Sequence, residues 1–299
     1  METPPGHVPV MLEEVLEHLK PRPGQVFLDG TAGGGGHAAV LLERLRPGGR
    51  LFLLDRDSEA LERLKARFGR PRDVEYCHAD FRDFDRALAE SGAPLLDGVL
   101  LDLGVSSQQI ASDRGFSFER PDFLDMRYDR DQALTAHDIV NHWDARRLAD
   151  LVSVLADQPY ARRIARAIVE NRPIETADRL ARIVAAAQPA AYRRRKRGHP
   201  ATRVFLALRM AVNDELDGLD EFCGKIFDRL KPGGRVAVIS FHSGEDRVVK
   251  NRFREAARAQ VATLVTRKPL TPTAEEISRN LRSRSAKLRV AERLGPGAG

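Results

Sequence analysis

Short apolar runs recur along the first third of the chain, separated by segments whose apolar residues have helical spacing. The runs are 26–28, 51–54, 74–78 and 98–101, and each ends at or next to an acidic residue. In segments 38–45 and 58–68, between the first three runs, apolar residues recur every three or four positions. This alternation predicts an α/β fold, a parallel sheet with helices on both faces.

The acids at the ends of these runs are Asp29, Asp55, Asp80 and Asp102, at intervals of 26, 25 and 22 residues. Each interval is the length of one strand, turn, helix and return loop. Because a doubly wound sheet binds its ligand beyond the carboxyl ends of its strands, we expect these acids to converge on one crevice. Carboxylates around a glycine-rich floor suit a nucleoside cofactor that has positive charge.

A fifth strand is expected at 236–239, because the turn at 45–50 before the second strand has a close copy at 230–235. This run lies about 130 residues beyond the fourth, where one helical connection needs roughly 25. The sheet is therefore interrupted by an inserted unit, in which 145–155, 160–170 and 176–187 have helical spacing. The predicted domains are 1–111 and 204–299 for the sheet and 112–203 for a helical insert.

Beyond the fifth strand, the sequence predicts a basic helix over 245–259 and strands over 261–265 and 288–291. A short helix is expected after Thr273, and Ser58 is expected to be the N-cap of the helix at 58–68.

The first acid begins the glycine-rich segment Asp29-Gly30-Thr31-Ala32-Gly33-Gly34-Gly35-Gly36-His37. A Walker-type phosphate loop is excluded, because that motif ends in Gly-Lys followed by Ser or Thr. Both a dinucleotide fingerprint, Gly33-x-Gly35-x-x-Ala38, and an S-adenosylmethionine pattern, Asp29-x-x-x-Gly33-x-Gly35, fit the segment. A carboxylate at Asp29 would repel a pyrophosphate and attract an ammonium or sulfonium group. The loop therefore favours S-adenosylmethionine.

Asp102 and the residues after it occupy the position that faces the methyl group in sheet methyltransferases. A cytosine amino nitrogen shares its lone pair with the ring and is a poor nucleophile. A hydrogen-bond acceptor for its N–H, here Asp102, restores lone-pair character as the methyl group arrives. The alternative role for Asp102 is that of a helix N-cap.

Several motifs are shared with one known family, and they lie at 7–10, 29–37, 101–107, 114–118, 124–127, 199–203, 240–247 and 284–289. On these motifs the chain resembles, over nearly its whole length, the ribosomal RNA small subunit methyltransferase H family, also called MraW. The resemblance implies a Rossmann-like class I S-adenosylmethionine-dependent methyltransferase sheet with an inserted all-helical domain. One departure is Gly244, where the family commonly has leucine, which loosens the start of a helix. Asp102-Leu103-Gly104 also lacks the paired prolines of the wider group of amino-methyltransferases.

The family's reaction is N4-methylation of a single cytidine in the decoding region of 16S ribosomal RNA. The cofactor contacts that the resemblance implies are Gly35, Gly36, His37, Asp55, Phe81, Asp102 and Gln109. Among the aromatic groups that could hold an unstacked base, Phe241 and His242 are the best placed, because they follow a strand end. Phe116 and Phe118 are alternatives, and whether His242 is a proton acceptor or a structural residue stays open.

The charge of the chain favours a polyanionic partner, since 49 lysines and arginines outnumber 43 acids. The densest cationic run is 192–199, at the end of the insert, for which we predict phosphate binding rather than a solvated loop. Arg247, Lys250, Arg252 and Arg254 add charge on the helix after His242. The expected partner is 16S ribosomal RNA or the small ribosomal subunit.

Other classes of protein are disfavoured by what the chain does not contain. No apolar stretch is long enough to span a membrane, and 1–9 does not resemble a secretory signal. Cys77 and Cys223 match no metal or redox spacing, so we predict a cytoplasmic enzyme without a metal. A small-molecule methyltransferase and a non-catalytic RNA-binding assembly factor remain alternatives, and the oligomeric state, monomer or homodimer, stays open.

Overall fold

The computed structural model describes residues 9–195 and 198–295. The chain divides into two units, one made of 1–104 with 216–299 and the other of 105–215. The predicted insert, 112–203, lies inside the second unit, which begins earlier and ends later. The difference arises because α11 (Thr202–Asn213) packs its apolar face into the core of the helical unit, so the chain returns to the sheet only after this helix.

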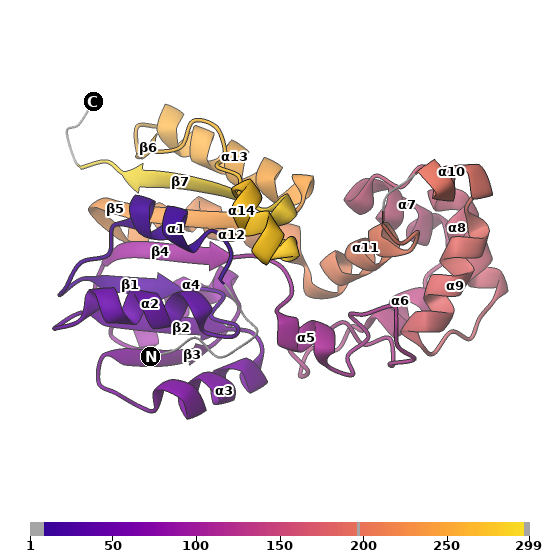
Figure 1. Ribbon diagram of the computed structural model, residues 1–299, viewed down its shortest axis with the longest axis horizontal. Helices are drawn as coiled ribbons and strands as arrows, with labels where there is room; N and C mark the ends of the chain where they lie inside the picture. The colour runs from indigo at the N-terminus through magenta and orange to yellow at the C-terminus, as the bar shows by residue number, and fades with distance from the viewer. Residues whose placement is uncertain (1–8, 196–197, 296–299) are drawn as a thin grey trace. The chain divides into compact units, whose positions relative to one another are not determined.

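Seven strands of the first unit form one sheet in the order β3-β2-β1-β4-β5-β7-β6 (Figure 1). They are β1 (Val26–Asp29), β2 (Arg50–Asp55), β3 (Val74–His78), β4 (Leu96–Asp102), β5 (Leu230–Ser240), β6 (Ala262–Leu264) and β7 (Lys287–Arg293). The first five strands run parallel, and β7 runs antiparallel to both of its neighbours. The predicted α/β class is confirmed.

The fifth strand is longer than predicted, because the expected turn at 230–235 is part of it. Leu96 pairs with Leu230 and Gly98 pairs with Arg235, so the residues between Leu230 and Arg235 bulge out of the ladder. The turn residues are therefore accommodated inside the strand as an irregularity.

Helices cover both faces of the sheet, and the alternation of strand residues decides which face each one meets. Phe27, Leu51 and Leu53 share a core with α1 (Leu12–Leu19), α2 (Gly36–Leu45) and α3 (Ser58–Phe68). Leu28, Phe52 and Leu54 share the opposite core with α4 (Phe84–Glu90), α12 (Glu215–Arg229) and α13 (Ser243–Arg258). Successive residues of a strand point to opposite faces, which is why neighbours in sequence belong to different cores.

The starts of several short elements were also predicted, with one correction. Asp57, not Ser58, is the N-cap of α3, because its carboxylate accepts the N–H of Glu59. Thr273 caps α14 (Ala274–Arg279) as expected. Two 3-10 helices, η1 (Phe81–Asp83) and η2 (Leu281–Ser285), complete the first unit.

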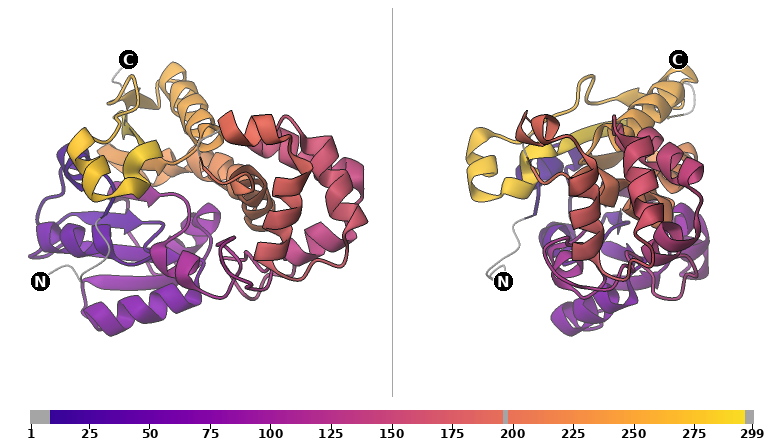
Figure 2. Two further views of the ribbon diagram at one scale, coloured as in Figure 1. Left: turned by 45° about the vertical axis from the view of Figure 1, so that its right-hand side comes forward. Right: turned by 90° about the vertical axis from the view of Figure 1, so that its right-hand side faces the viewer.

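The second unit is built from helices around a core of its own. They are α5 (Ser107–Ala111), α6 (Ala136–His142), α7 (Ala145–Ala156), α8 (Ala161–Glu170), α9 (Ala177–Ala187), α10 (Ala190–Arg195) and α11. Figure 2 shows the helices from α6 to α11, in pink to orange-red, gathered into one bundle. The helices predicted at 145–155, 160–170 and 176–187 agree with α7, α8 and α9 to within one residue at each end.

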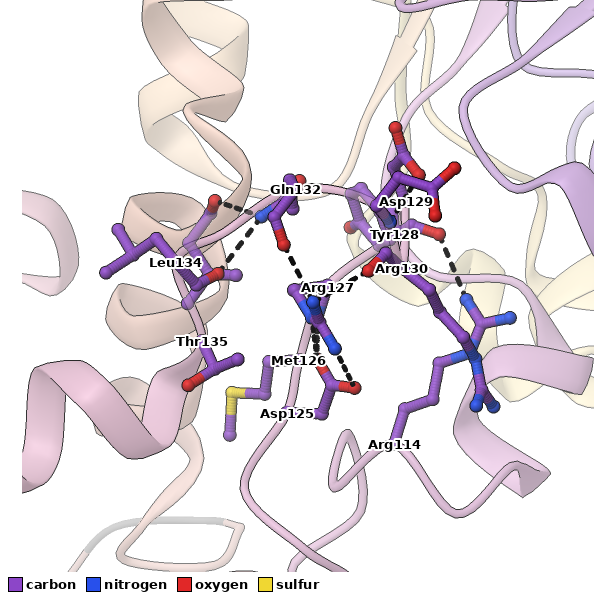
Figure 3. Close-up of polar contacts among 12 residues, drawn as sticks. Arg114, Asp125, Met126, Arg127, Tyr128, Asp129, Arg130, Gln132, Leu134 and Thr135 are labelled. Carbon is purple, nitrogen blue, oxygen red and sulfur yellow. Dashed lines mark hydrogen bonds and ion pairs between the residues drawn. The ribbon is translucent and has the colours of Figure 1, made fainter.

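The segment between α5 and α6 has little regular structure and is held by arginines (Figure 3). Nε of Arg127 donates to Asp125 Oδ1 at 2.6 Å, and its Nη1 donates to the carbonyl oxygens of Arg130 and Gln132, both at 2.7 Å. Met126, between Asp125 and Arg127, is buried, and its φ of 59° lies in the left-handed region that residues other than glycine rarely adopt. The motif at 124–127 is therefore structural, since it fixes the path of this loop.

Both cysteines are buried in the first unit. Among the described residues, no helix combines the length and apolar character needed to cross a membrane.

Candidate active site

Acidic residues end three adjacent parallel strands of the sheet. Asp29, Asp55 and Asp102 are the last residues of β1, β2 and β4. Asp29 pairs with Leu53 on one side and with Leu100 on the other, so the three carboxyl ends lie at one edge of the sheet. Asp80 follows β3 and caps η1. The prediction that each of these four acids ends or follows a strand is confirmed.

Asp55 holds the glycine-rich loop in place. Its Oδ2 accepts the N–H of Gly33 at 2.7 Å, and its Oδ1 accepts the N–H of Asp57 at 2.8 Å. Each carboxylate oxygen has a second lone pair, so Asp55 can still accept hydrogen bonds from two hydroxyl groups of a ligand.

Two of the four consecutive glycines are required by close packing. Gly35 has φ of 72°, and a Cβ there would lie 2.5 Å from Cδ2 of Leu64. A Cβ on Gly36 would lie 2.8 Å from Cγ of Pro9. The loop is therefore pressed between α3 and the segment before α1, and the backbone at the start of α2 stays free of side chains.

His37, on the first turn of α2, is buried and its tautomer follows from its partner. Its Nε2 lies 3.0 Å from the carbonyl oxygen of Val10. Because a carbonyl only accepts, Nε2 must have the hydrogen. Nδ1 of the neutral ring is then an acceptor, and it lies 3.6 Å from Oδ2 of Asp102.

At 3.6 Å these two atoms are just beyond hydrogen-bond distance, so the contact between His37 and Asp102 is electrostatic. Burial raises the pKa of Asp102 well above its usual range, and the charges of Asp29 and Glu245 raise it further. Oδ1 of Asp102 is buried and accepts no hydrogen bond from the residues that the structure describes. The backbone of Asp102 is fixed separately, by its N–H, which donates to Oγ1 of Thr31 at 2.6 Å.

The other carboxyl groups at this edge are also hard to ionise. Burial, and to a lesser extent the charge of Asp55, raises the pKa of Asp29 to about 7. Burial raises the pKa of Asp55 to about 6. Like charges at one desolvated edge favour a cationic ligand, because positive charge stabilises the ionised form of every acid there.

Asp80 differs from the other acids because arginines already neutralise it. Its Oδ2 lies 3.1 Å from Nη1 of Arg56 and 3.1 Å from Nε of Arg82. Phe81 is half-buried and meets Phe222 edge to face, with 5.9 Å between ring centroids. The ring of Phe81 remains suited to an adenine, whereas the carboxylate of Asp80 is largely occupied.

The loop after β5 lies beside the loop after β4. The N–H of Leu103 donates to the carbonyl of Ile239, and a Cβ on Gly104 would lie 3.6 Å from the ring of Phe241. The N–H of Phe241 donates to Oε2 of Glu245 at 2.8 Å. Phe241 is thus held by its backbone while its half-buried ring lies next to the segment that follows Asp102.

His242 is the N-cap of α13. Its Nδ1 accepts the N–H groups of Gly244 and Glu245 at 3.2 and 3.4 Å, and its Nε2 lies 3.2 Å from Oε1 of Glu245. A Cβ on Gly244 would come within 3.1 Å of the His242 ring, so glycine at this position leaves room for the cap. These contacts favour the structural role among the two that the sequence left open.

Gln109 and the remaining aromatic candidates lie in the second unit. The side-chain oxygen of Gln109 accepts the N–H of Ser106 at 2.9 Å, within a capping box at the start of α5. Phe116 stacks on Tyr128, and Phe118 stacks on His199 with 4.3 Å between centroids. Both phenylalanines are therefore engaged by rings of their own unit.

The basic run is only partly described. Arg193, Arg194 and Arg195 are exposed on α10, and Tyr192 meets Tyr160 edge to face. Lys196 and Arg197 lie outside the described residues, as do His7 and Val8 of the first motif.

Thr31, Val10 and Glu245 are contributors that sequence reasoning did not single out. Thr31 and Val10 act through contacts with distant parts of the chain, Asp102 and His37, and no local pattern marks such contacts. Glu245 acts on Phe241 and His242, three to four residues before it.

The family model and the curated relatives that match this chain belong to one family. Residues 5–294 match the family model described as the MraW methylase family. A ribosomal RNA small subunit methyltransferase H from Nitratidesulfovibrio vulgaris (strain DSM 19637 / Miyazaki F) is 49% identical over 315 residues, covering 97% of this chain and 86% of that protein. The protein of the same name from Pelobacter propionicus is 47% identical, covering 96% of this chain and 98% of that protein. A solved structure of an rRNA methylase from Streptococcus thermophilus gives a TM-score of 0.46 at 12% identity, covering 97% of this chain and all of that one.

Proposed function

This chain belongs to the MraW methylase family, and on that premise we propose that it methylates N4 of a cytidine in the decoding region of 16S ribosomal RNA. Its cofactor is S-adenosylmethionine, and its substrate is ribosomal RNA of the small subunit. The observation that supports the proposal most directly is the partly buried carboxyl of Asp102 at the end of β4, whose buried Oδ1 is engaged by no described residue.

The residues at the sheet edge fit this cofactor. The pKa values of Asp29, Asp55 and Asp102 are all raised, so a ligand with positive charge is favoured there. When bound, S-adenosylmethionine supplies a methyl group on a positively charged sulfur, which makes that methyl electrophilic. We assign to cofactor binding the residues Gly35, Gly36, His37, Asp55, Phe81, Asp102 and Gln109. Asp55 would accept the ribose hydroxyls, and Phe81 would contact the adenine.

Asp102 is the proposed catalytic residue. Its Oδ1 can accept an N–H of the cytosine amino group, which leaves the nitrogen lone pair available. A methylated amino nitrogen must lose one proton, and Asp102 can take it. His37, whose Nδ1 faces Oδ2 of Asp102 at 3.6 Å, would accept a hydrogen bond from the protonated carboxyl if the two atoms came about 0.5 Å closer.

Of the other two catalytic candidates, we propose that Phe241 contacts the base and that His242 positions Phe241. Enzymes that modify a base take it out of the stack and hold it between aromatic or apolar side chains. The ring of Phe241 lies beside Gly104, two residues after Asp102, and suits that role. His242 would act by fixing the start of α13, which positions Phe241 through their common partner Glu245.

The helical unit is the proposed RNA-recognition domain, since the exposed arginines of α10 lie on it. We place the enzyme in the cytoplasm, where its substrate is made. A homodimer remains an open alternative to a monomer.

Mass spectrometry of 16S ribosomal RNA tests the proposal. Small subunits from cells that lack the gene are incubated with the purified protein and isotopically labelled S-adenosylmethionine. The expected product is one labelled N4-methylcytidine in the decoding region. Absence of labelled RNA would favour a small-molecule methyltransferase or a non-catalytic assembly factor, and label on another atom or base would refute the assigned position.

A further inference from the structure

Helix α13 joins the active site to the surface of the sheet unit. It begins directly after the loop that contains Phe241 and His242, and it runs for 16 residues. Val249 and Phe253 on one side are buried in the core that covers the sheet. The apolar side of the helix is thus fully used inside the protein.

The opposite side of α13 has four cations at helical spacing. Arg247, Lys250, Arg254 and Arg258 are separated by 3, 4 and 4 residues, so they lie along one side of the helix. From first to last they extend about 16 Å. Arg247, Arg254 and Arg258 are exposed, and Lys250 is partly exposed. We call these four residues the α13 stripe.

The acids of α13 form ion pairs with residues outside the α13 stripe, so they do not neutralise its charge. Asp246 pairs with Lys287 and Arg289 at 3.3 and 2.7 Å. Glu255 pairs with Arg252, which is also held by Asp220. No carboxylate in the described parts of the chain forms an ion pair with a member of the α13 stripe.

These ion pairs determine which cations of the helix are available to a ligand. Arg252 was expected from the sequence to add to the basic surface, but its guanidinium is neutralised by Asp220 and Glu255. Arg258 takes its place. At the far end of the stripe, Arg254 and Arg258 line an open hollow of about 350 Å³ together with Ala257 and Leu264.

We propose that the α13 stripe binds the phosphate backbone of the substrate RNA, so that the sheet unit holds RNA independently of the helical unit. The proposal rests on the proposed function and adds a surface to it. The planar guanidinium of arginine presents donors that match the oxygens of a phosphate. A row of cations without acidic partners displaces the counterions condensed on a nucleic acid, which favours binding. An anionic membrane is disfavoured as the partner, because a helix that lies on a membrane needs an exposed apolar side, and that of α13 is buried.

The test compares two variants with the same change in net charge. The first replaces the stripe, by Arg247→Gln, Lys250→Gln, Arg254→Gln and Arg258→Gln. The control is Arg46→Gln, Arg86→Gln, Lys225→Gln and Arg279→Gln, which removes three arginines and one lysine that already pair with acids of the same unit. Exposed substitutions of this kind change stability little. Thermal unfolding and S-adenosylmethionine affinity check that both variants fold.

We expect the stripe variant to bind a transcript of the decoding region at least about tenfold more weakly at 0.1 M salt. If three of the four cations meet phosphates of a single strand, the slope of log K against log salt becomes flatter by about 2 units. The KM for RNA rises while kcat at saturating RNA and the affinity for S-adenosylmethionine stay near wild type. The control variant keeps most of the affinity and the slope.

An unchanged RNA affinity and salt slope in the stripe variant, with a wild-type protein that does methylate RNA, would overturn the proposal. Equal losses in the stripe and control variants would also overturn it, because net charge alone would then explain the effect. Loss of binding to vesicles of anionic lipid, with RNA binding intact, would assign the stripe to a membrane. A wild-type protein that neither binds nor methylates RNA would refute the proposed function itself. If the fourfold variant does not fold, the pairs Arg247/Lys250 and Arg254/Arg258 are replaced separately and read against the same outcomes.

Discussion

Asp55 is the residue on which cofactor affinity should depend most. Asp55→Ala removes a carboxylate that holds Gly33 and that has lone pairs left for ribose hydroxyls. Loss of charge-assisted hydrogen bonds costs about 2–3 kcal/mol. Calorimetry should therefore show S-adenosylmethionine bound tens of fold more weakly, or worse. Glu62→Ala, an exposed acid on α3, serves as the control, and an unchanged affinity in Asp55→Ala would remove Asp55 from the site.

Asp102→Asn should lower the rate of methyl transfer much more than the affinity for S-adenosylmethionine. The substitution keeps the shape and one acceptor oxygen but loses the charge and the ability to take a proton. Single-turnover rates at saturating cofactor and RNA should fall about 100-fold or more, within the usual range for acid–base assistance. Cofactor affinity should fall much less. A near-normal rate would refute the catalytic role and direct attention to Ser106, Ser240 or His242.

The raised pKa values of Asp29 and Asp55 predict opposite pH effects on stability and on cofactor affinity. Folding raises both pKa values, so the folded protein keeps protons that the unfolded chain loses. Their contribution to stability is complete below about pH 4 and is lost as the pH rises through about 6 for Asp55 and about 7 for Asp29. A cationic ligand favours the ionised acids, so its affinity should rise over the same interval, with release of protons.

Two measurements check these pH effects. Calorimetry at pH 6.5 in buffers of different ionisation enthalpy should report protons released on S-adenosylmethionine binding. Asp29→Asn should flatten the pH dependence of the melting temperature of the cofactor-free protein between about pH 5 and 7.5. Binding enthalpies that do not depend on the buffer would contradict the assignment of these acids to a cation site.

At the scale of elements, α10 offers a direct test of the helical unit. Replacing Arg193, Arg194 and Arg195 by glutamine should weaken RNA binding and flatten its salt dependence by about 2 units if three phosphates are contacted. Cofactor affinity should not change. Arg182→Gln is the matched control, because this exposed arginine of α9 already pairs with Asp178 at 2.7 Å. A salt dependence equal to that of the wild type would mean that these three arginines are solvated and do not contact RNA.

Elements whose residues follow a strong local pattern were predictable. The strands that end at Asp29, Asp55 and Asp102 are apolar runs bounded by polar residues. The insert was predicted from the length of chain between the strand that ends at Asp102 and the fifth strand. Where no polar residues mark the start of a strand, its start was predicted wrongly. The start of β5 at Leu230 was predicted as a turn, because Pro232, Gly233 and Gly234 are turn residues, and only pairing with β4 keeps them in the strand.

At the scale of the whole molecule, the positions of the candidate residues were predictable, but not what each side chain does. Strand order places acids at one edge, and that order follows from alternation. The roles depend on partners. His37 has its tautomer set by Val10, Asp80 is neutralised by Arg56 and Arg82, and His242 caps a helix. Each of these contacts joins side chains whose distances only the folded chain determines.

The position of the insert also has a consequence for how a growing chain folds on the ribosome. The last residue of β4 is made 128 residues before the first residue of β5, an interval of about 6 to 26 seconds at the usual rate of translation. During that time β4 is an edge strand with unpaired backbone groups, which can template pairing with another chain. The helical unit has its own core and can complete it within this interval. The time during which a half-made sheet is open to mispairing is therefore set by the length of the insert and not by the sheet.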